Sequence, residues 1–108
     1  MHPEEPDLES VTLAAVMAAL SDPVRVRIVR TLATQGERTC GTFELGISKA
    51  TRSHHFKVLR EAGLTHTRSE GTHRHVSLRR EEVDARFPGL LDAVLTAAER
   101  EAAGPALV

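Results

Sequence analysis

The sequence contains no tryptophan and no tyrosine, and phenylalanine occurs only three times in 108 residues. Hydrophobic residues still make up 41% of the chain, so we expect a small and mostly aliphatic core. The single cysteine excludes an internal disulfide. No run approaches the ~20 apolar residues of a membrane-spanning helix, so we expect no membrane partner. Disulfide-stabilised domains and membrane proteins are thereby excluded.

The first ten residues, MHPEEPDLES, lack the basic region and the apolar region that a secretory signal combines. With one cysteine and no signal, we expect the protein in a reducing cytoplasm. The length predicts one small domain over residues 8–103. Residues 1–7 hold two prolines and three acids and are predicted to form a flexible acidic tail, and residues 104–108 a short carboxyl-terminal tail.

The formal net charge is only −1, but the charges are unevenly distributed along the chain. Residues 21–80 hold twelve Lys or Arg against five acids, whereas the two flanks together hold two against ten. A basic middle between acidic ends is typical of a DNA-binding body whose termini face elsewhere. An ordinary solvated surface that is merely uneven is the alternative.

Apolar residues recur at helical spacing in several segments, which predict helices over residues 8–20, 24–34, 81–87 and 90–103. Ser21-Asp22-Pro23 is a helix-entry signal before the second of these. In that helix Val24, Ile28, Val29 and Leu32 are predicted to form a buried face, and Arg25, Arg27 and Arg30 a basic one. Residues 37–46 hold two glycines and are predicted to form at most one or two turns.

Residues 48–64, SKATRSHHFKVLREAGL, combine a helix start, an apolar seam and a polar face. Ser48 can cap the amino end, Phe56 and Leu59 continue the seam, and Gly63 can end the helix. Lys and Arg meet phosphates in a DNA groove, while Ser, Thr, His and Arg also reach base edges. This segment is therefore predicted to be a recognition helix.

Residues 65–69 and 72–78 are rich in Thr, Val and Ser and flank Glu70-Gly71, which predicts a β-hairpin. Together with the preceding helices, the hairpin predicts a mainly α fold with a two-stranded β-hairpin, a winged helix-turn-helix. In this fold the hairpin is the wing.

Three stretches carry a family resemblance: ALSDPVR at residues 19–25 with Ile28, SHHFKVLREAGL at residues 53–64, and the wing from Arg68 to His75. In these the chain resembles the bacterial ArsR-type transcriptional regulators. The resemblance implies a homodimer built from the first and last helices, which presents two recognition helices to a palindromic operator on double-stranded DNA. It also implies repression that some unknown inducing signal relieves, in the bacterial cytoplasm at the nucleoid.

The predicted DNA contacts lie on the recognition helix and the wing. Neighbouring residues on a helix lie about 100° apart, so His54 and His55 cannot both face DNA. Arg52 stands where the family usually has Val or Ile, and either it reaches DNA or its stem lies along the core. The predicted set is Ser48, Lys49, Thr51, Arg52, Ser53, His54, His55, Lys57, Arg60, Arg68, Thr72, His73 and Arg74.

The first and last helices carry more apolar positions than one small core can cover, which independently favours a dimer. Packing of these helices against their own chain alone is the alternative. The predicted dimerisation residues are Val11, Leu13, Val16, Met17, Leu91, Val94, Leu95 and Ala98.

We expect no metal and no other cofactor. A thiolate site needs two or three cysteines, but Cys40 is alone, and residues 90–103 hold no histidine for the family's second type of site. A metal or redox sensor using Cys40 or the wing histidines His73 and His75 remains an alternative, as does a winged-helix protein-interaction module. No Cys-His or Ser-His-Asp arrangement is supported, so an enzyme is not expected.

Overall fold

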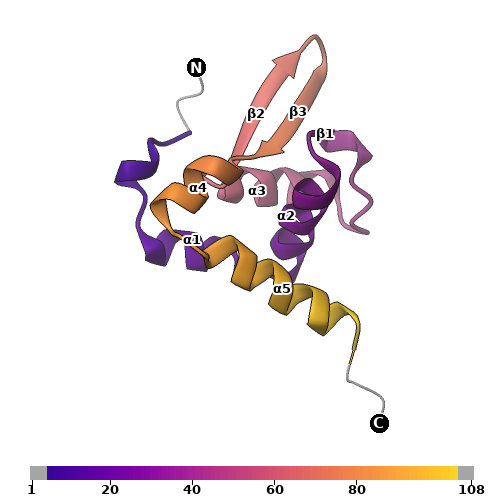
Figure 1. Ribbon diagram of the computed structural model, residues 1–108. Helices are drawn as coiled ribbons and strands as arrows, with labels where there is room; N and C mark the ends of the chain where they lie inside the picture. Colours follow the sequence, from indigo (N-terminus) through magenta and orange to yellow (C-terminus); the bar gives the residue numbers. More distant parts are fainter. Residues whose placement is uncertain (1–4, 105–108) are drawn as a thin grey trace.

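The computed structural model describes residues 5–104, a helical body with a three-stranded antiparallel sheet (Figure 1). The hairpin projects from one side of the body, and the last helix lies along the opposite side. The elements are α1 (Leu13–Ala19), α2 (Pro23–Gln35), β1 (Arg38–Thr39), α3 (Lys49–Glu61), β2 (Thr65–Glu70), β3 (His73–Leu78), α4 (Arg80–Arg86) and α5 (Leu90–Ala102), with 3-10 turns at Leu8–Ser10 and Cys40–Thr42. None of the helices within residues 5–104 is long and apolar enough to cross a membrane.

The first predicted helix is broken in two. A 3-10 turn occupies Leu8–Ser10, and α1 starts only after Thr12, whose backbone is extended at φ −89° and ψ 153°. The hydroxyl of Thr12 accepts a hydrogen bond from the Ala15 N–H at 3.1 Å and so caps the new helix. The prediction of one helix over residues 8–20 was therefore wrong, because apolar spacing continues through a residue that acts as a cap.

Asp22, and not Ser21, caps α2. Its carboxylate accepts hydrogen bonds from the N–H groups of Val24 at 2.7 Å and Arg25 at 3.2 Å. Pro23 occupies the first turn, where its missing N–H leaves no partner unsatisfied. The Ser21 hydroxyl instead donates to the Ala18 carbonyl at 2.6 Å, at the end of α1.

The sheet has strand order β1-β3-β2, so it has one strand more than the predicted hairpin. Arg38 pairs with Val76, and Thr39 with His75. The added strand lies in the segment that was predicted to hold only turns. A strand of only two residues is too short to show an alternation of apolar and polar residues in the sequence. Arg38 and Thr39 form a strand because they pair with β3. The hairpin itself is confirmed, with Glu70 opposite His73.

The core lies where α2, α3, the base of the sheet and α4 meet. Ile28, Leu59, Val76 and Val83 are fully buried there. The rings of Phe43 and Phe56 meet edge to face with their centroids 5.2 Å apart. The core is mostly aliphatic, as predicted. The apolar side of α3 packs against it.

The predicted flexible tail at residues 1–7 is only partly described, since residues 1–4 lie outside the described residues. At residues 5–7 the chain makes contacts that the prediction of a flexible tail did not include. The Glu5 carboxylate lies 2.6 Å from Nδ1 of His66 and accepts from the Thr67 N–H at 3.1 Å. The Arg79 guanidinium donates to the Pro6 carbonyl at 2.8 Å. Of the carboxyl-terminal tail, only Gly104 is described.

Candidate nucleic-acid interface

Helix α3 presents one polar side to solvent and one apolar side to the core. Its first turn is capped by the Ser48 hydroxyl, which accepts from the Thr51 N–H at 3.1 Å and donates to the Thr51 hydroxyl at 2.9 Å. The Ser48 hydroxyl therefore has a structural role. The exposed residues of the predicted set on this helix are Lys49, Thr51, Ser53, His54 and Lys57.

His55 and Arg60 do not belong to this exposed side. Their exposed fractions are 7% and 9%, because they share the inward side of α3 with Phe56 and Leu59. Nδ1 of His55 accepts a hydrogen bond from the Arg25 guanidinium at 3.2 Å. Both residues were predicted as DNA contacts, and the structure corrects this. Of the two adjacent histidines, His54 is the one that faces solvent.

Arg52 lies one turn before Phe56, at the edge of the inward side, and is half-buried. This placement is intermediate between the two alternatives that the sequence left open.

The wing carries one arginine that is held by carboxylates and one that is not. Arg68 forms ion pairs with Glu37 at 2.9 Å and Glu70 at 2.6 Å. The hydrogen bonds from Glu37 and Glu70 raise the pKa of Arg68, and Arg68 in turn lowers the pKa of both carboxyls. Within residues 5–104, Arg74 has no ion pair, and its side chain is exposed. Arg74 is thus the wing cation better placed to meet a phosphate.

Thr72 and His73 are also exposed, beside the turn of the hairpin. Gly71, with φ +61°, occupies that turn and allows the two strands to reverse over two residues. These side chains share the tip of the wing with Arg74, and the tip projects away from the helical body (Figure 1).

Cys40 is half-buried next to β1. Burial raises the pKa of its thiol, although the charges of Arg74, Arg52 and Arg60 act in the opposite direction. The rings of His73 and His75 lie 6.4 Å apart between centroids. No group of three or more His, Cys, Asp or Glu side chains within residues 5–104 is arranged to hold a metal ion.

The predicted dimerisation residues divide into three groups. Val11, Val16 and Leu91 are buried in the protein's own core, so their prediction as interface residues was wrong. Leu13 and Met17 on α1 are 49% and 57% exposed. The remaining three, Val94, Leu95 and Ala98 on α5, are half-buried.

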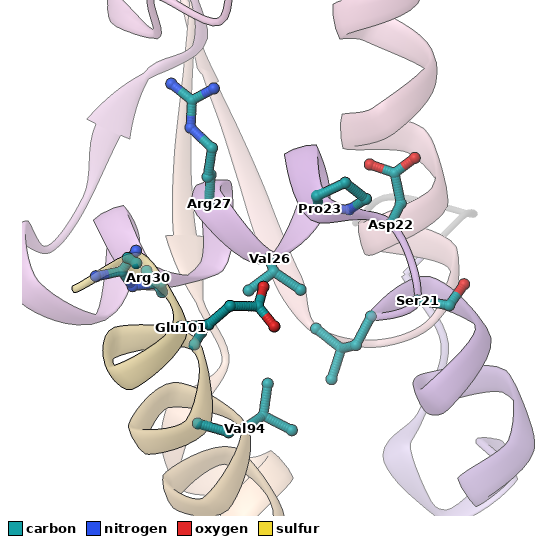
Figure 2. A pocket seen from close by; sticks show the side chains of 12 residues that line it. Ser21, Asp22, Pro23, Val26, Arg27, Arg30, Val94 and Glu101 are labelled. Carbon is teal, nitrogen blue, oxygen red and sulfur yellow. The ribbon is translucent and has the colours of Figure 1, made fainter. Parts of the chain in front are cut away.

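An open cavity of about 790 Å³ lies between α2 and α5, next to the end of α1. Leu20, Pro23, Val26 and Val94 provide much of its apolar wall. Figure 2 shows Val26 and Val94 directed into it from the two helices, while Arg27 points away. Apolar surface is therefore left uncovered between α2 and α5, the helix that carries the half-buried Val94 and Ala98.

On the sequence alone, Arg25 was assigned to the basic, solvent-facing side of α2. That prediction missed that this side chain faces the interior of the protein. Its spacing to Ile28, Val29 and Leu32 is three, four and seven residues, which is the spacing of one helix face. This signal was available in the sequence. The structure shows Arg25 half-buried on that face, in contact with α1 and α3.

Known proteins resemble the chain over the region just described. The family model of a helix-turn-helix domain matches residues 20–68. The HTH-type transcriptional regulator YceK of Bacillus subtilis, itself uncharacterized, is 44% identical over 84 residues, covering 75% of this chain and 84% of that protein. A crystal structure of a possible transcriptional regulator for arsenical resistance is 28% identical, with a TM-score of 0.57 over 83% of this chain and 95% of its own.

A second crystal structure, of an ArsR family transcriptional regulator, has a TM-score of 0.57 over 94% of this chain and 99% of its own. At 22% identity it is similar in fold. The exposed side of α3, the wing and these relatives point to the same conclusion. This chain belongs to the helix-turn-helix transcriptional regulators, and its fold is similar to that of an ArsR family regulator.

Proposed function

We propose that the protein is a homodimeric repressor that binds a palindromic operator and uses no metal cofactor. The observation that carries this proposal is the exposed polar side of α3 beside a wing whose tip holds an exposed Arg74. The recognition helix enters the major groove, and the wing lies along the neighbouring minor groove. A regulator of this kind works on the chromosome, so we place it at the bacterial nucleoid.

Base reading falls to the middle of α3, where Ser53 and His54 are exposed. Histidine and serine side chains can each donate a hydrogen bond to a base edge or accept one from it. Lys49, Lys57 and Arg74 contact phosphates, which carry no sequence information but set the register of the helix. Arg68 contributes only if DNA displaces Glu37 and Glu70 from its guanidinium.

The dimer is supported by apolar surface that one subunit leaves uncovered. Leu13 and Met17 are the large hydrophobic side chains most exposed within residues 5–104. They lie four residues apart on α1, so they form one patch. Pairing of α1 and α5 across a two-fold axis would cover this patch and the cavity, and would place two α3 helices ~34–36 Å apart.

Operator binding can be tested on the promoter region upstream of the protein's own coding sequence, by fluorescence anisotropy at several salt concentrations. Log affinity should fall by ~0.9 per log unit of salt for each phosphate that is neutralised. Lys57→Ala removes one phosphate contact from each subunit of the dimer and should lower this slope by about 1.8. His54→Ala should weaken operator binding more than non-operator binding. Arg100→Ala, at an exposed position on α5, is the matched control and should leave the slope unchanged.

Two results would contradict the proposal. If Lys57→Ala and His54→Ala bind as the wild type does, α3 does not present the reading face. If the protein does not bind this promoter region, the basic surface serves another partner, and the protein-interaction module becomes the better account.

A further inference from the structure

One guanidinium joins three helices inside the protein. Arg25 lies in the first turn of α2, and its Nε donates to the Ala19 carbonyl at 2.6 Å. Its Nη2 lies 3.4 Å from the Ala18 carbonyl, also in the last turn of α1. Its Nη1 donates to Nδ1 of His55 on α3 at 3.2 Å. The side chain thus connects the carboxyl end of α1 with the middle of the recognition helix.

The chemistry of the two side chains determines how they meet. A guanidinium has only donors, so Nδ1 of His55 must be the acceptor, and the proton of the neutral ring is on Nε2. The backbone of Arg25 is itself held, because its N–H donates to the Asp22 carboxylate at 3.2 Å. The ring of His55 is 7% exposed, so water offers little replacement for the lost partner.

His55 is next to His54, which faces solvent. Because α3 is one rigid element, a contact that orients His55 relative to α1 also orients the neighbouring position of His54. The other end of the connection is α1, whose exposed Leu13 and Met17 form the proposed dimer patch. Reading of two half-sites requires the two α3 helices to keep a set orientation relative to the dimer axis.

We propose that Arg25 and His55 are positioning residues for operator recognition: their hydrogen bond orients the exposed side of α3 relative to α1. The inference rests on the proposed function, since it concerns how the operator is read. It predicts that the loss of this bond impairs discrimination between DNA sequences more than it impairs binding to DNA as such.

The test compares the affinity for the operator with that for a scrambled duplex of equal length, at one salt concentration. A variant that is partly unfolded loses both affinities equally, so their ratio is unaffected by a purely structural defect. His55→Leu removes the acceptor, and Arg25→Lys leaves a single ammonium that cannot span three acceptors. For both we expect the ratio to fall by about tenfold, the discrimination that one misplaced base contact carries.

Two further variants serve as controls. His55→Asn keeps an acceptor close to the place of Nδ1 and should restore the ratio to within about threefold of the wild type, a fraction of one base contact. Arg27→Lys makes the same chemical change at an exposed position two residues away and should leave the ratio unchanged. If His55→Asn is as impaired as His55→Leu, the ring's packing and not its hydrogen bond is responsible, and the proposed mechanism fails.

The remaining outcomes separate this inference from the proposed function. A wild type that discriminates, with Arg25→Lys and His55→Leu variants that discriminate equally well, overturns the positioning role alone. A wild type that binds the operator and the scrambled duplex with equal affinity overturns both the positioning role and the proposed function. The ¹⁵N chemical shifts of the His55 ring provide a readout without DNA. They should show Nδ1 unprotonated and Nε2 protonated near neutral pH, and a protonated Nδ1 would refute the contact.

Discussion

The carboxyl group of Asp22, which caps α2, has a lowered pKa because of the groups around it. Burial alone would raise the pKa of this carboxyl. Hydrogen bonds from the N–H groups of Arg25 and Val24, together with the nearby charge of Arg25, instead hold the pKa below its ordinary value of 3.8. The carboxylate form is therefore the one that the folded state prefers.

Replacement of Asp22 should destabilise the protein in a pH-dependent way. Asp22→Ala removes the cap and should lower the free energy of unfolding by about 1 kcal/mol at pH 7. Because the pKa is lower in the folded state, this contribution is complete above the unfolded value and is lost as the pH falls through the folded value. The difference between wild type and Asp22→Ala in urea denaturation should hence be constant above about pH 5 and shrink below about pH 4.

Asp22→Asn is the matched control, since asparagine caps helices about as well as aspartate but does not titrate. It should match the wild type closely at pH 7. A difference between wild type and Asp22→Ala that stays constant down to pH 3 would show that the charge of Asp22 does not contribute to the cap.

At the scale of elements, the end of α3 determines how the chain enters the wing. The N–H of Leu64 donates to the Leu59 carbonyl and that of Gly63 to the Arg60 carbonyl, both at 3.0 Å. This is a Schellman motif, and it places Gly63 in the left-handed region at φ +78°. The segment before α1 packs on this corner, so a Cβ at Gly63 would lie 3.0 Å from Cγ2 of Val11.

Two glycine substitutions separate the conformational effect from the packing effect. Gly71→Ala at the wing tip meets nothing within 4 Å and should destabilise by about 1–2 kcal/mol from its left-handed backbone alone. Gly63→Ala carries the same penalty and should lose about 1–3 kcal/mol more from overpacking against Val11. Thermal or urea unfolding of both variants checks this order. If the two variants lose equal stability, the segment around Val11 moves to accommodate the added Cβ without a cost in free energy.

At the scale of the whole molecule, the central question is what covers the apolar patch of Leu13 and Met17. The subunit buries Val16 and Leu91 itself, so the surface left for a partner is narrower than the sequence predicted. The exposed patch and the cavity between α2 and α5 are the surfaces that remain.

Met17→Glu should convert the proposed dimer to a monomer. A carboxylate buried without a partner is strongly unfavourable, so we expect dimer affinity to fall by at least about 100-fold. Sedimentation velocity measures the mass, and operator binding should weaken in parallel because the second half-site contact is lost. Ala33→Glu adds the same charge at an exposed position on α2 and should change neither property. A wild type that sediments as a single subunit would contradict the dimer itself.

Local patterns were sufficient to predict most of the elements. The apolar spacing and the cap at Ser48 predicted α3, and the β-branched run around Gly71 predicted the hairpin, because each signal lies within a few residues of the structure it specifies. The same is true of the mostly aliphatic core. The polar side of α3 also followed from spacing, which correctly left His54 or His55, but not both, facing solvent.

Features that depend on contacts between distant segments could not be predicted in this way. The short strand β1 exists only because β3 pairs with it, and the hydrogen-bond partner of His55 is an arginine thirty residues earlier. The pairing of Arg68 with Glu37 similarly joins segments far apart in the chain. Periodicity reports which face of an element is apolar, but the partner of each polar group depends on which elements meet, and that emerges only when the chain packs.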